Sequence, residues 1–134
     1  MNTWGNKIRL SIFGESHGEA IGIVIDGLEA GTKLNLENIN KFIERRKAGK
    51  SSFTTSRKEK DECKILSGVF DEKTLGTPIA IIVENHDTSS SNYEALQGVY
   101  RPSHADYTYE KKFNSLLFQG GGRASGRETI GRVL

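Results

Sequence analysis

A glycine-bounded turn near the N-terminus gathers side chains that could do acid–base chemistry. Residues 14–18 are Gly-Glu-Ser-His-Gly, so Glu15, Ser16 and His17 are consecutive. Glycine lets a backbone approach a ligand closely, and an imidazole titrates near neutral pH, which makes His17 a candidate general acid or base. The Ser16–His17 pair also suggests a hydrolase, although adjacent residues seldom have the geometry of a nucleophile and its base. On its own, the motif is as consistent with an ordinary surface turn.

A second candidate is His104, in the motif Arg-Pro-Ser-His-Ala-Asp-Tyr at residues 101–107. Ser103 and Asp106 have the spacing of a helix start, which predicts a helix capped by Ser103 with His104 in its first turn. The positive end of the helix dipole disfavours imidazolium there, so His104 would stay neutral and able to exchange protons. For this motif alone, a histidine hydrogen-bonded to its own turn is the commoner arrangement.

The third histidine and the single cysteine carry weaker signals. His86 lies beside Asp87 in a polar segment and is predicted to be exposed, whereas Cys63 lies in an apolar run and is predicted to be an inert core thiol. One cysteine allows neither an intrachain disulfide nor a cysteine-based zinc cluster, and no two histidines have the short spacing of metal ligands. No metal site is therefore predicted.

Basic residues are concentrated between Arg45 and Lys60. Seven of these side chains are Lys or Arg and only Glu59 is acidic, whereas the whole chain, with 19 basic and 17 acidic residues, has a net charge of +2. Such a local excess suits an anionic ligand, either a small phosphate or nucleic acid. It is equally typical of a solvated loop.

A glycine-rich segment, GGGRASGRET at residues 120–129, runs into a predicted helix start at Ser125, where Glu128 completes a capping-box pattern. Free backbone N–H groups, the helix dipole and Arg123 would together form an anion site. The segment lacks the P-loop lysine and does not follow a buried strand, so neither a Walker loop nor a dinucleotide fingerprint is predicted. A flexible turn before a capped helix is an equally good interpretation.

Hydrophobic periodicity places these motifs on a small set of elements. Period-two alternation predicts paired strands on either side of the turn at 14–18, and helical spacing predicts a helix capped by Asn35 and ended by Gly49, with Arg45 and Arg46 in its last turn. The predicted strands cover residues 7–13, 21–28, 63–70 and 77–85, with a turn at 71–76, and further helices are predicted from residues 103 and 125. The predicted fold class is α+β, with antiparallel strands and helices.

The two ends of the chain carry separate signals. Ile130, Val133 and Leu134 lie on a developing apolar helix face and the chain stops before any cap, a pattern that predicts a fragment, incomplete at the C-terminus. The N-terminus lacks the apolar run of a signal peptide, and no segment approaches the roughly 20 apolar residues of a membrane span. A soluble, cytoplasmic protein with no membrane partner is expected.

Six motifs together are far more specific than any one of them. They are GESHG, ERRKAG, ILSGVF, GTPIA, RPSHADYTYEKK and GGGRASGRET, in this order across nearly the whole chain. This series resembles the chorismate synthase family, whose members continue well beyond Leu134. The resemblance implies that residues 1–134 are the N-terminal portion of a catalytic domain, part of a β-α-β sandwich that assembles as a homotetramer when full length.

The resemblance also implies a reaction and roles for particular residues. Members of the family are carbon–oxygen lyases of the shikimate pathway, in aromatic amino acid biosynthesis. They convert 5-enolpyruvylshikimate 3-phosphate to chorismate by 1,4-anti elimination of phosphate. The reaction requires reduced FMN (FMNH2) but involves no net redox change, and the family is also associated with NADP. His17 would donate a proton to the departing phosphate, and His104 would exchange a proton with the reduced flavin. Substrate-binding residues would be Arg46 and Arg45, and FMN-contacting residues Arg123, Ala124 and Ser125.

The chain departs from the family pattern at three places. Lys47-Ala48 replaces the usual Arg-Pro, Ser52 stands where many members have a second binding arginine, and Ala124 replaces a common serine. The first two weaken any claim about a particular arginine–substrate contact. The third removes one hydroxyl, although backbone donors at a helix start could still hold the flavin phosphate.

Two other classes of function compete with an enzyme. A nucleic-acid-binding module could use the basic segment from Arg45 to Lys60, but the near-neutral net charge and the presence of Phe53 as the one interleaved aromatic disfavour it. A phosphate-binding domain without catalysis could use the glycine-rich segment alone. The sequence therefore favours an enzyme with a small anionic substrate and no nucleic-acid partner.

Overall fold

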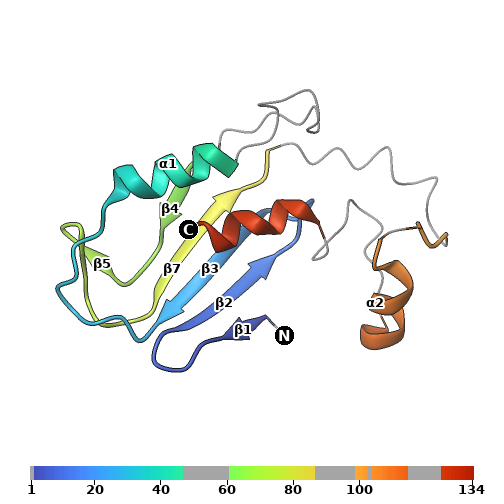
Figure 1. Ribbon diagram of the computed structural model, residues 1–134, viewed down its shortest axis with the longest axis horizontal. Coiled ribbons are helices and arrows are strands. Elements are labelled where there is room, and N and C mark those ends of the chain that lie inside the picture. The colour runs from blue at the N-terminus through green and yellow to red at the C-terminus, as the bar shows by residue number, and fades with distance from the viewer. Residues whose placement is uncertain (1, 47–60, 87–98, 103, 115–124) are drawn as a thin grey trace.

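An antiparallel sheet forms the centre of the molecule (Figure 1). The structure, a computed structural model, describes residues 2–46, 61–86, 99–102, 104–114 and 125–134. Its strand order is β1-β2-β3-β7-β4, and every neighbouring pair is antiparallel. The strands are β1 (Thr3–Trp4), β2 (Arg9–Gly14), β3 (Ala20–Asp26), β7 (Ile79–Glu84) and β4 (Cys63–Ile65). The predicted pairing of the strands around residues 14–18 is confirmed.

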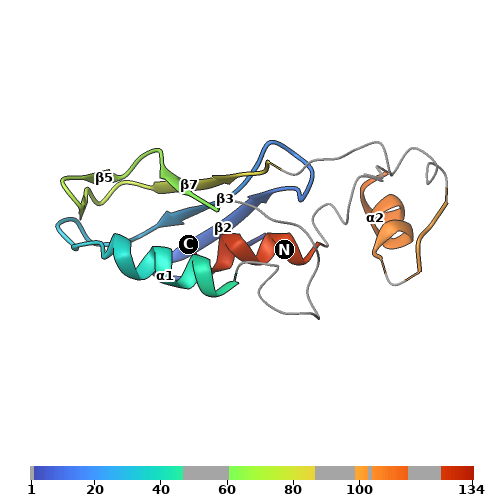
Figure 2. The same cartoon turned by 90° about the horizontal axis from the view of Figure 1, so that it is seen from above.

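Two helices cover one face of this sheet, and Figure 2 shows both on the same side of it. Helix α1 (Leu36–Arg46) begins where the Asn38 N–H donates to Asn35 Oδ1 at 2.9 Å, so the predicted cap is confirmed. The second helix, η3 (Gly126–Arg132), is a 3₁₀ helix that starts after Ser125, as predicted. An α+β fold with antiparallel strands and helices is therefore confirmed.

Strand register explains how the core forms between sheet and helices. Ile12, Ile23 and Ile81 are aligned across β2, β3 and β7, and all three point to the same side because strand side chains alternate. They form one buried cluster, and a second contains Ile21, Ile43, Val83 and Ile130. The second cluster joins the sheet to α1 and η3, so burial of apolar surface holds the two helices against the end of the sheet that bears residues 14–18.

The predicted strand at 63–70 is two strands separated by a bend, and the predicted turn at 71–76 is confirmed only at Asp71 and Glu72, because Lys73 and Thr74 form a strand. Gly68 has φ +78° and an added Cβ would lie 2.6 Å from Pro78 O, so the chain bends there, at a position that suits glycine. Beyond the bend, β5 (Val69–Phe70) and β6 (Lys73–Thr74) form a separate two-stranded sheet. Asp71 and Glu72 connect them with φ of 48° and 56°, the positive values of a tight hairpin turn.

Helix α2 (Asp106–Phe113) stands apart from the layer of sheet and helices in both views (Figures 1 and 2). Its start differs from the predicted one. The N-cap position is Ala105, with no side-chain cap, and Asp106 is the first helical residue. The Asp106 carboxylate instead accepts from Arg101, because a charged fork of donors binds a carboxylate more strongly than a neutral backbone N–H does. The predicted stop at Gly49 lies outside the described residues.

Candidate active site

The GESHG motif forms a tight turn between β2 and β3. Gly14 has φ +90°, and an added Cβ would lie 2.1 Å from Ala20 O, so this position requires glycine. The Gly18 N–H donates to Glu15 O at 3.1 Å and closes the turn. His17 is thus carried between two strands that both contribute to the core.

His17 is half-buried, and its neighbour Ser16 is completely buried, with an exposed fraction of 0%. Ser16 Oγ lies 3.1 Å from His17 Nδ1, so the two adjacent side chains do share a hydrogen bond. A nucleophile must reach its substrate, however, and the buried Ser16 hydroxyl cannot. The contact orients the imidazole ring and gives no support to a hydrolase.

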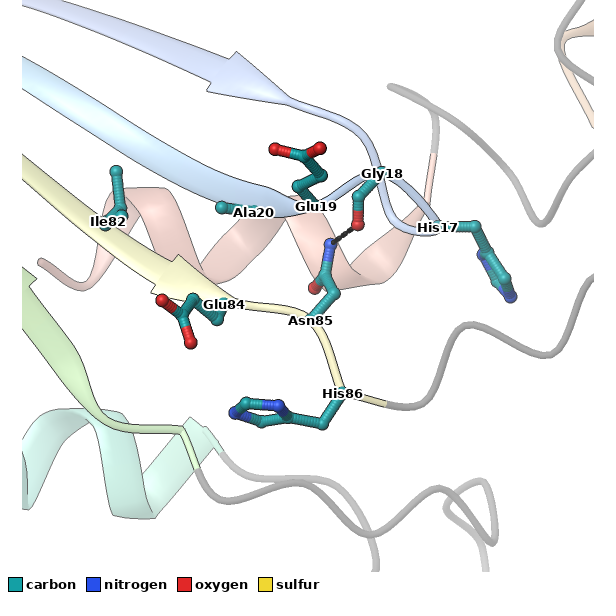
Figure 3. Close-up of a pocket in the computed structure, with 8 residues that line it drawn as sticks. All are labelled: His17, Gly18, Glu19, Ala20, Ile82, Glu84, Asn85 and His86. Atoms are coloured by element: carbon teal, nitrogen blue, oxygen red, sulfur yellow. Dashed lines mark hydrogen bonds between the residues drawn. The ribbon is translucent and has the colours of Figure 1, made fainter.

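A cavity of about 450 Å³ adjoins the turn (Figure 3). Its lining residues are His17, Gly18, Glu19, Ala20, Ile82, Glu84, Asn85 and His86. The lining comes from two distant parts of the sequence because β3 and β7 are paired with Ala20 opposite Glu84. His86 is exposed, as predicted, yet it lines the same cavity as His17, a proximity that only the strand pairing creates.

Acidic side chains and histidines both line this cavity. Lys64 Nζ lies 2.5 Å from Glu84 Oε1, and this hydrogen bond lowers the pKa of the Glu84 carboxyl. The Lys64 ammonium offsets the negative charge of Glu84, so this carboxylate does not by itself set the polarity of the cavity.

Asn85, at the end of β7, fixes the turn from behind. Its side-chain Nδ2 donates to Glu15 O and to Gly18 O, both at 2.9 Å, and the latter bond is drawn in Figure 3. Its backbone N–H donates to Glu19 O at 2.9 Å. Its Oδ1 accepts from Arg127 Nε at 3.0 Å. Sequence analysis missed this residue, which lies in the last position of a strand pattern and has no motif of its own.

A buried carboxylate continues this chain of contacts to α1. Asp61 Oδ1 accepts from Arg127 Nη1 at 2.5 Å and Asp61 Oδ2 accepts from Arg46 Nη1 at 3.1 Å. The exposed fractions of the three side chains are 1% for Asp61, 6% for Arg127 and 15% for Arg46. A buried charge needs such partners, and each oxygen of Asp61 accepts from a guanidinium group. Asp61 and Arg127 were also missed, although each lies in or beside a predicted motif.

The two arginines predicted to bind substrate have different settings. Arg46 is held by Asp61 and by Thr129, whose Oγ1 accepts from Arg46 Nε at 3.2 Å. Arg45 is exposed and its guanidinium lies 5.5 Å from the centre of the Phe42 ring. The structure therefore joins Arg46, and not Arg45, to the network that reaches the His17 turn.

His104 precedes α2 and does not lie in its first turn, so that part of the prediction is wrong. Its backbone N–H donates to Arg101 O at 3.2 Å, and its Nδ1 donates to Pro102 O at 3.1 Å. A carbonyl can only accept, so Nδ1 carries a proton, and in the neutral ring Nε2 is the basic nitrogen. The helix-dipole argument for a neutral His104 lapses, and the alternative of a histidine bonded to its own turn is confirmed.

The turn that carries His104 is closed by an ion pair. Asp106 accepts from the backbone N–H of Arg101 at 3.0 Å and from its Nε and Nη2 at 2.8 and 2.9 Å. These bonds lower the pKa of the Asp106 carboxyl to about 2. Because α2 stands apart from the sheet, the described residues do not bring His104 together with His17 (Figure 1).

Of the predicted flavin-contacting residues, the structure describes one. Ser125 caps η3 by accepting from the Arg127 N–H at 3.2 Å, and a Cβ added to Gly126 would meet no atom within 4 Å. Arg123 and Ala124 lie outside the described residues, as do Lys47, Ala48 and Ser52.

A metal site and a membrane-spanning helix are both absent from the described residues. Within them, no group of three or more His, Cys, Asp or Glu side chains could hold a metal ion. Nor does a helix there combine the length and hydrophobicity that crossing a membrane requires. Cys63 is half-buried against both core clusters, and burial raises the pKa of its thiol, as expected of a core cysteine.

The molecule is an α+β domain in which helices cover one face of an antiparallel sheet. A histidine lies on an interstrand turn, and a network of arginine side chains lies behind that turn, an arrangement suited to proton transfer beside an anion. The chain belongs to the chorismate synthase family, whose model matches residues 8–134. It is 54% identical over 132 residues to the chorismate synthase of Synechocystis sp., covering 98% of this chain and 36% of that one. With the chorismate synthase of Azobacteroides pseudotrichonymphae the identity is 52% over 134 residues, covering 100% of this chain and 38% of the relative.

A solved structure agrees with this assignment. A crystal structure of chorismate synthase superposes with a TM-score of 0.66 and 32% sequence identity, covering 96% of this chain and 32% of that one. The chain thus spans about a third of the length of the relatives that it matches.

Proposed function

We propose that this chain provides the His17 half of a chorismate synthase site. The reaction is the 1,4-anti elimination of phosphate from 5-enolpyruvylshikimate 3-phosphate, which gives chorismate. The observation that carries the proposal is a half-buried histidine on a constrained turn, in a chain that belongs to this family. The turn is connected to Arg46 through the half-buried Asn85 and the buried side chains of Arg127 and Asp61. A proton donor near an anion-binding group is what the loss of phosphate requires.

His17 acts as general acid toward the departing phosphate. When Ser16 donates its hydroxyl proton to Nδ1, the imidazole proton lies on Nε2, which becomes the donating atom. The leaving oxygen gains negative charge as its bond to carbon breaks, so a proton or hydrogen bond from Nε2 helps most at that point. The Ser16 contact is compatible with this tautomer and holds the orientation of the ring.

Arg46 binds the anionic groups of the substrate, which are a phosphate and two carboxylates, and Arg45 supplies further positive charge at the exposed end of α1. The support for Arg46 is its place at the end of α1, where Asp61 and Thr129 hold its guanidinium in the network that reaches the His17 turn. Such charge-assisted bonds to phosphate or carboxylate are the strong ones in proteins.

Reduced FMN would be held by residues 123–125, and when bound it supplies the electron that the elimination borrows and returns. His104 serves it as a proton-exchanging partner, through the Nε2 that the Pro102 contact leaves as a base. Homotetrameric assembly and a cytoplasmic location belong to the same proposal. Their support is membership of the family.

A graft tests the assignment. Residues 1–134 replace the matching segment of the Synechocystis enzyme, so that the resulting grafted enzyme has the relatives' full length. We expect anaerobic chorismate formation with reduced FMN at a rate within about tenfold of the Synechocystis parent, since a family segment should bring compatible site residues. A folded graft that binds flavin but forms no chorismate would contradict the proposal, and would favour a phosphate-binding domain without catalysis.

A further inference from the structure

A continuous series of hydrogen bonds connects the His17 turn to Arg46, which lies at the end of a helix. The series passes from the turn to Asn85, then to Arg127 and Asp61, and reaches Arg46. In the part of the chain that the structure describes, no buried side-chain N or O atom is without a hydrogen-bond partner. The network is therefore saturated, and such a network allows one arrangement of its members.

The Asn85 amide can occupy this place in one orientation. Both N–H groups of Nδ2 are used, one for Glu15 O and one for Gly18 O, and Oδ1 accepts from Arg127 Nε. Rotation of the amide by half a turn would place Oδ1 against two carbonyl oxygens and the NH2 group against a guanidinium donor. Arg127 thus fixes the amide, and the amide in turn fixes both ends of the His17 turn.

We propose that Asn85 is a positioning residue for His17, and that Arg127 and Asp61 set the place of this turn relative to Arg46. For its chemistry the inference rests on the proposed function. If His17 donates a proton to a group that Arg46 binds, the two must keep a fixed separation, and this network is the connection between them. A displacement of a proton donor by about an ångström is enough to cost on the order of a hundredfold in rate.

Asn85→Asp in the grafted enzyme separates positioning from general stability. Aspartate keeps the shape of the side chain and still accepts from Arg127, but it donates to neither carbonyl and repels both. We expect amide exchange over residues 14–20 to speed up about tenfold and kcat to fall about tenfold or more, while KM stays within about twofold. If the aspartate variant does not fold, Asn85→Ser is measured in its place, because a serine side chain is too short to reach both carbonyls.

Thr74→Val is the matched control. Thr74 is 2% exposed, and its Oγ1 accepts from the Thr32 N–H at 2.9 Å and donates to Glu29 O at 2.5 Å. It therefore bridges two backbone groups of another turn, ahead of β7, whereas Asn85 lies just beyond the end of β7. Thr74→Val should lower Tm and leave both kcat and the exchange of residues 14–20 unchanged.

The two readouts distinguish this inference from the proposed function. Faster exchange at residues 14–20 together with a lower kcat supports positioning of a catalytic His17. Faster exchange in a graft that forms no chorismate supports positioning of the turn and contradicts the proposed reaction. An Asn85→Asp variant that loses Tm as Thr74→Val does, with unchanged exchange at residues 14–20 and unchanged kcat, overturns the positioning role.

Discussion

His17 and His104 are held in opposite ways, and the difference suits different proton transfers. His17 is half-buried with Nδ1 at Ser16, and in the proposed role its other nitrogen, Nε2, carries the proton to be donated. His104 is exposed with Nδ1 donating to Pro102 O, so its remaining nitrogen is a base. The same side chain is thereby given complementary roles by one neighbouring oxygen atom in each case.

Alanine substitution of each histidine in the grafted enzyme tests these roles. General acid–base assistance is typically worth about 10²–10⁴-fold, so His17→Ala and His104→Ala should each reduce the rate by that order with the fold intact. His104→Ala should also alter the pH titration of bound reduced flavin, followed by its absorption spectrum in the ternary complex, whereas His17→Ala should not. Wild-type rates in both variants, with normal flavin titration, would show that neither histidine is catalytic.

Arg46 and Asp61 belong to one ion-pair network, in which Asp61 bridges the guanidinium groups of Arg46 and Arg127. Truncation of Arg46 and truncation of Asp61 should therefore have different effects on the enzyme. Arg46→Ala leaves Asp61 paired with Arg127, so we expect a stable enzyme whose affinity for the phosphorylated substrate is lower by about tenfold to a hundredfold. Asp61→Ala leaves two guanidinium groups facing each other and should lower the free energy of unfolding by about 3–5 kcal/mol.

Lys41→Ala is the control for both variants, since this exposed side chain on α1 forms an ion pair with Glu37, on the same helix. Substrate affinity by fluorescence titration and urea unfolding provide the measurements. Unchanged affinity in Arg46→Ala would remove this residue from the substrate site.

At the scale of elements, the sequence predicts what local pattern determines. The alternation of Ile and Leu specifies β2, β3 and β7, and Asn35 and Ser125 mark the helix starts, because these signals act through near neighbours. The break after β4 carries no such signal. It depends on a close approach of Gly68 to Pro78, and on Asp71 and Glu72 in a hairpin turn that usually prefers Asn-Gly.

The candidate site divides in the same way. GESHG and the arginines at the end of α1 are recognisable because their residue types are contiguous. Only the packing of η3 on the sheet beside α1 allows the hydrogen bonds among Asp61, Asn85 and Arg127. No short-range sequence pattern links positions so far apart. The start of α2 was mispredicted because Arg101 competes for the carboxylate of Asp106.

The Arg101–Asp106 pair makes the order of the His104 turn dependent on pH. The pKa of Asp106 is about 2 in the folded protein, below its ordinary value of 3.8, so the pair contributes its full stability above about pH 4 and loses it as the pH falls toward 2. After allowance for solvent screening, we expect a loss on the order of 1–2 kcal/mol, seen as faster amide exchange in α2. Asp106→Asn should show fast exchange already at pH 6 and little further change in acid. Equal acid sensitivity in the variant and the parent would assign the effect to other carboxylates.

At the scale of the whole molecule, activity should depend on residues that relatives have in addition to the segment matched here. The chain covers 36% of the Synechocystis enzyme, and within it the described residues leave His104 apart from the cavity that His17 lines. We therefore predict that the 134-residue chain alone forms no chorismate anaerobically with reduced FMN and 5-enolpyruvylshikimate 3-phosphate, whereas the grafted enzyme does. Both proteins are compared at equal concentration with the Synechocystis parent as reference. Turnover of the short chain near that of the parent would mean that residues 1–134 hold a complete site, and the two histidines would then have to meet in a conformation different from the present one.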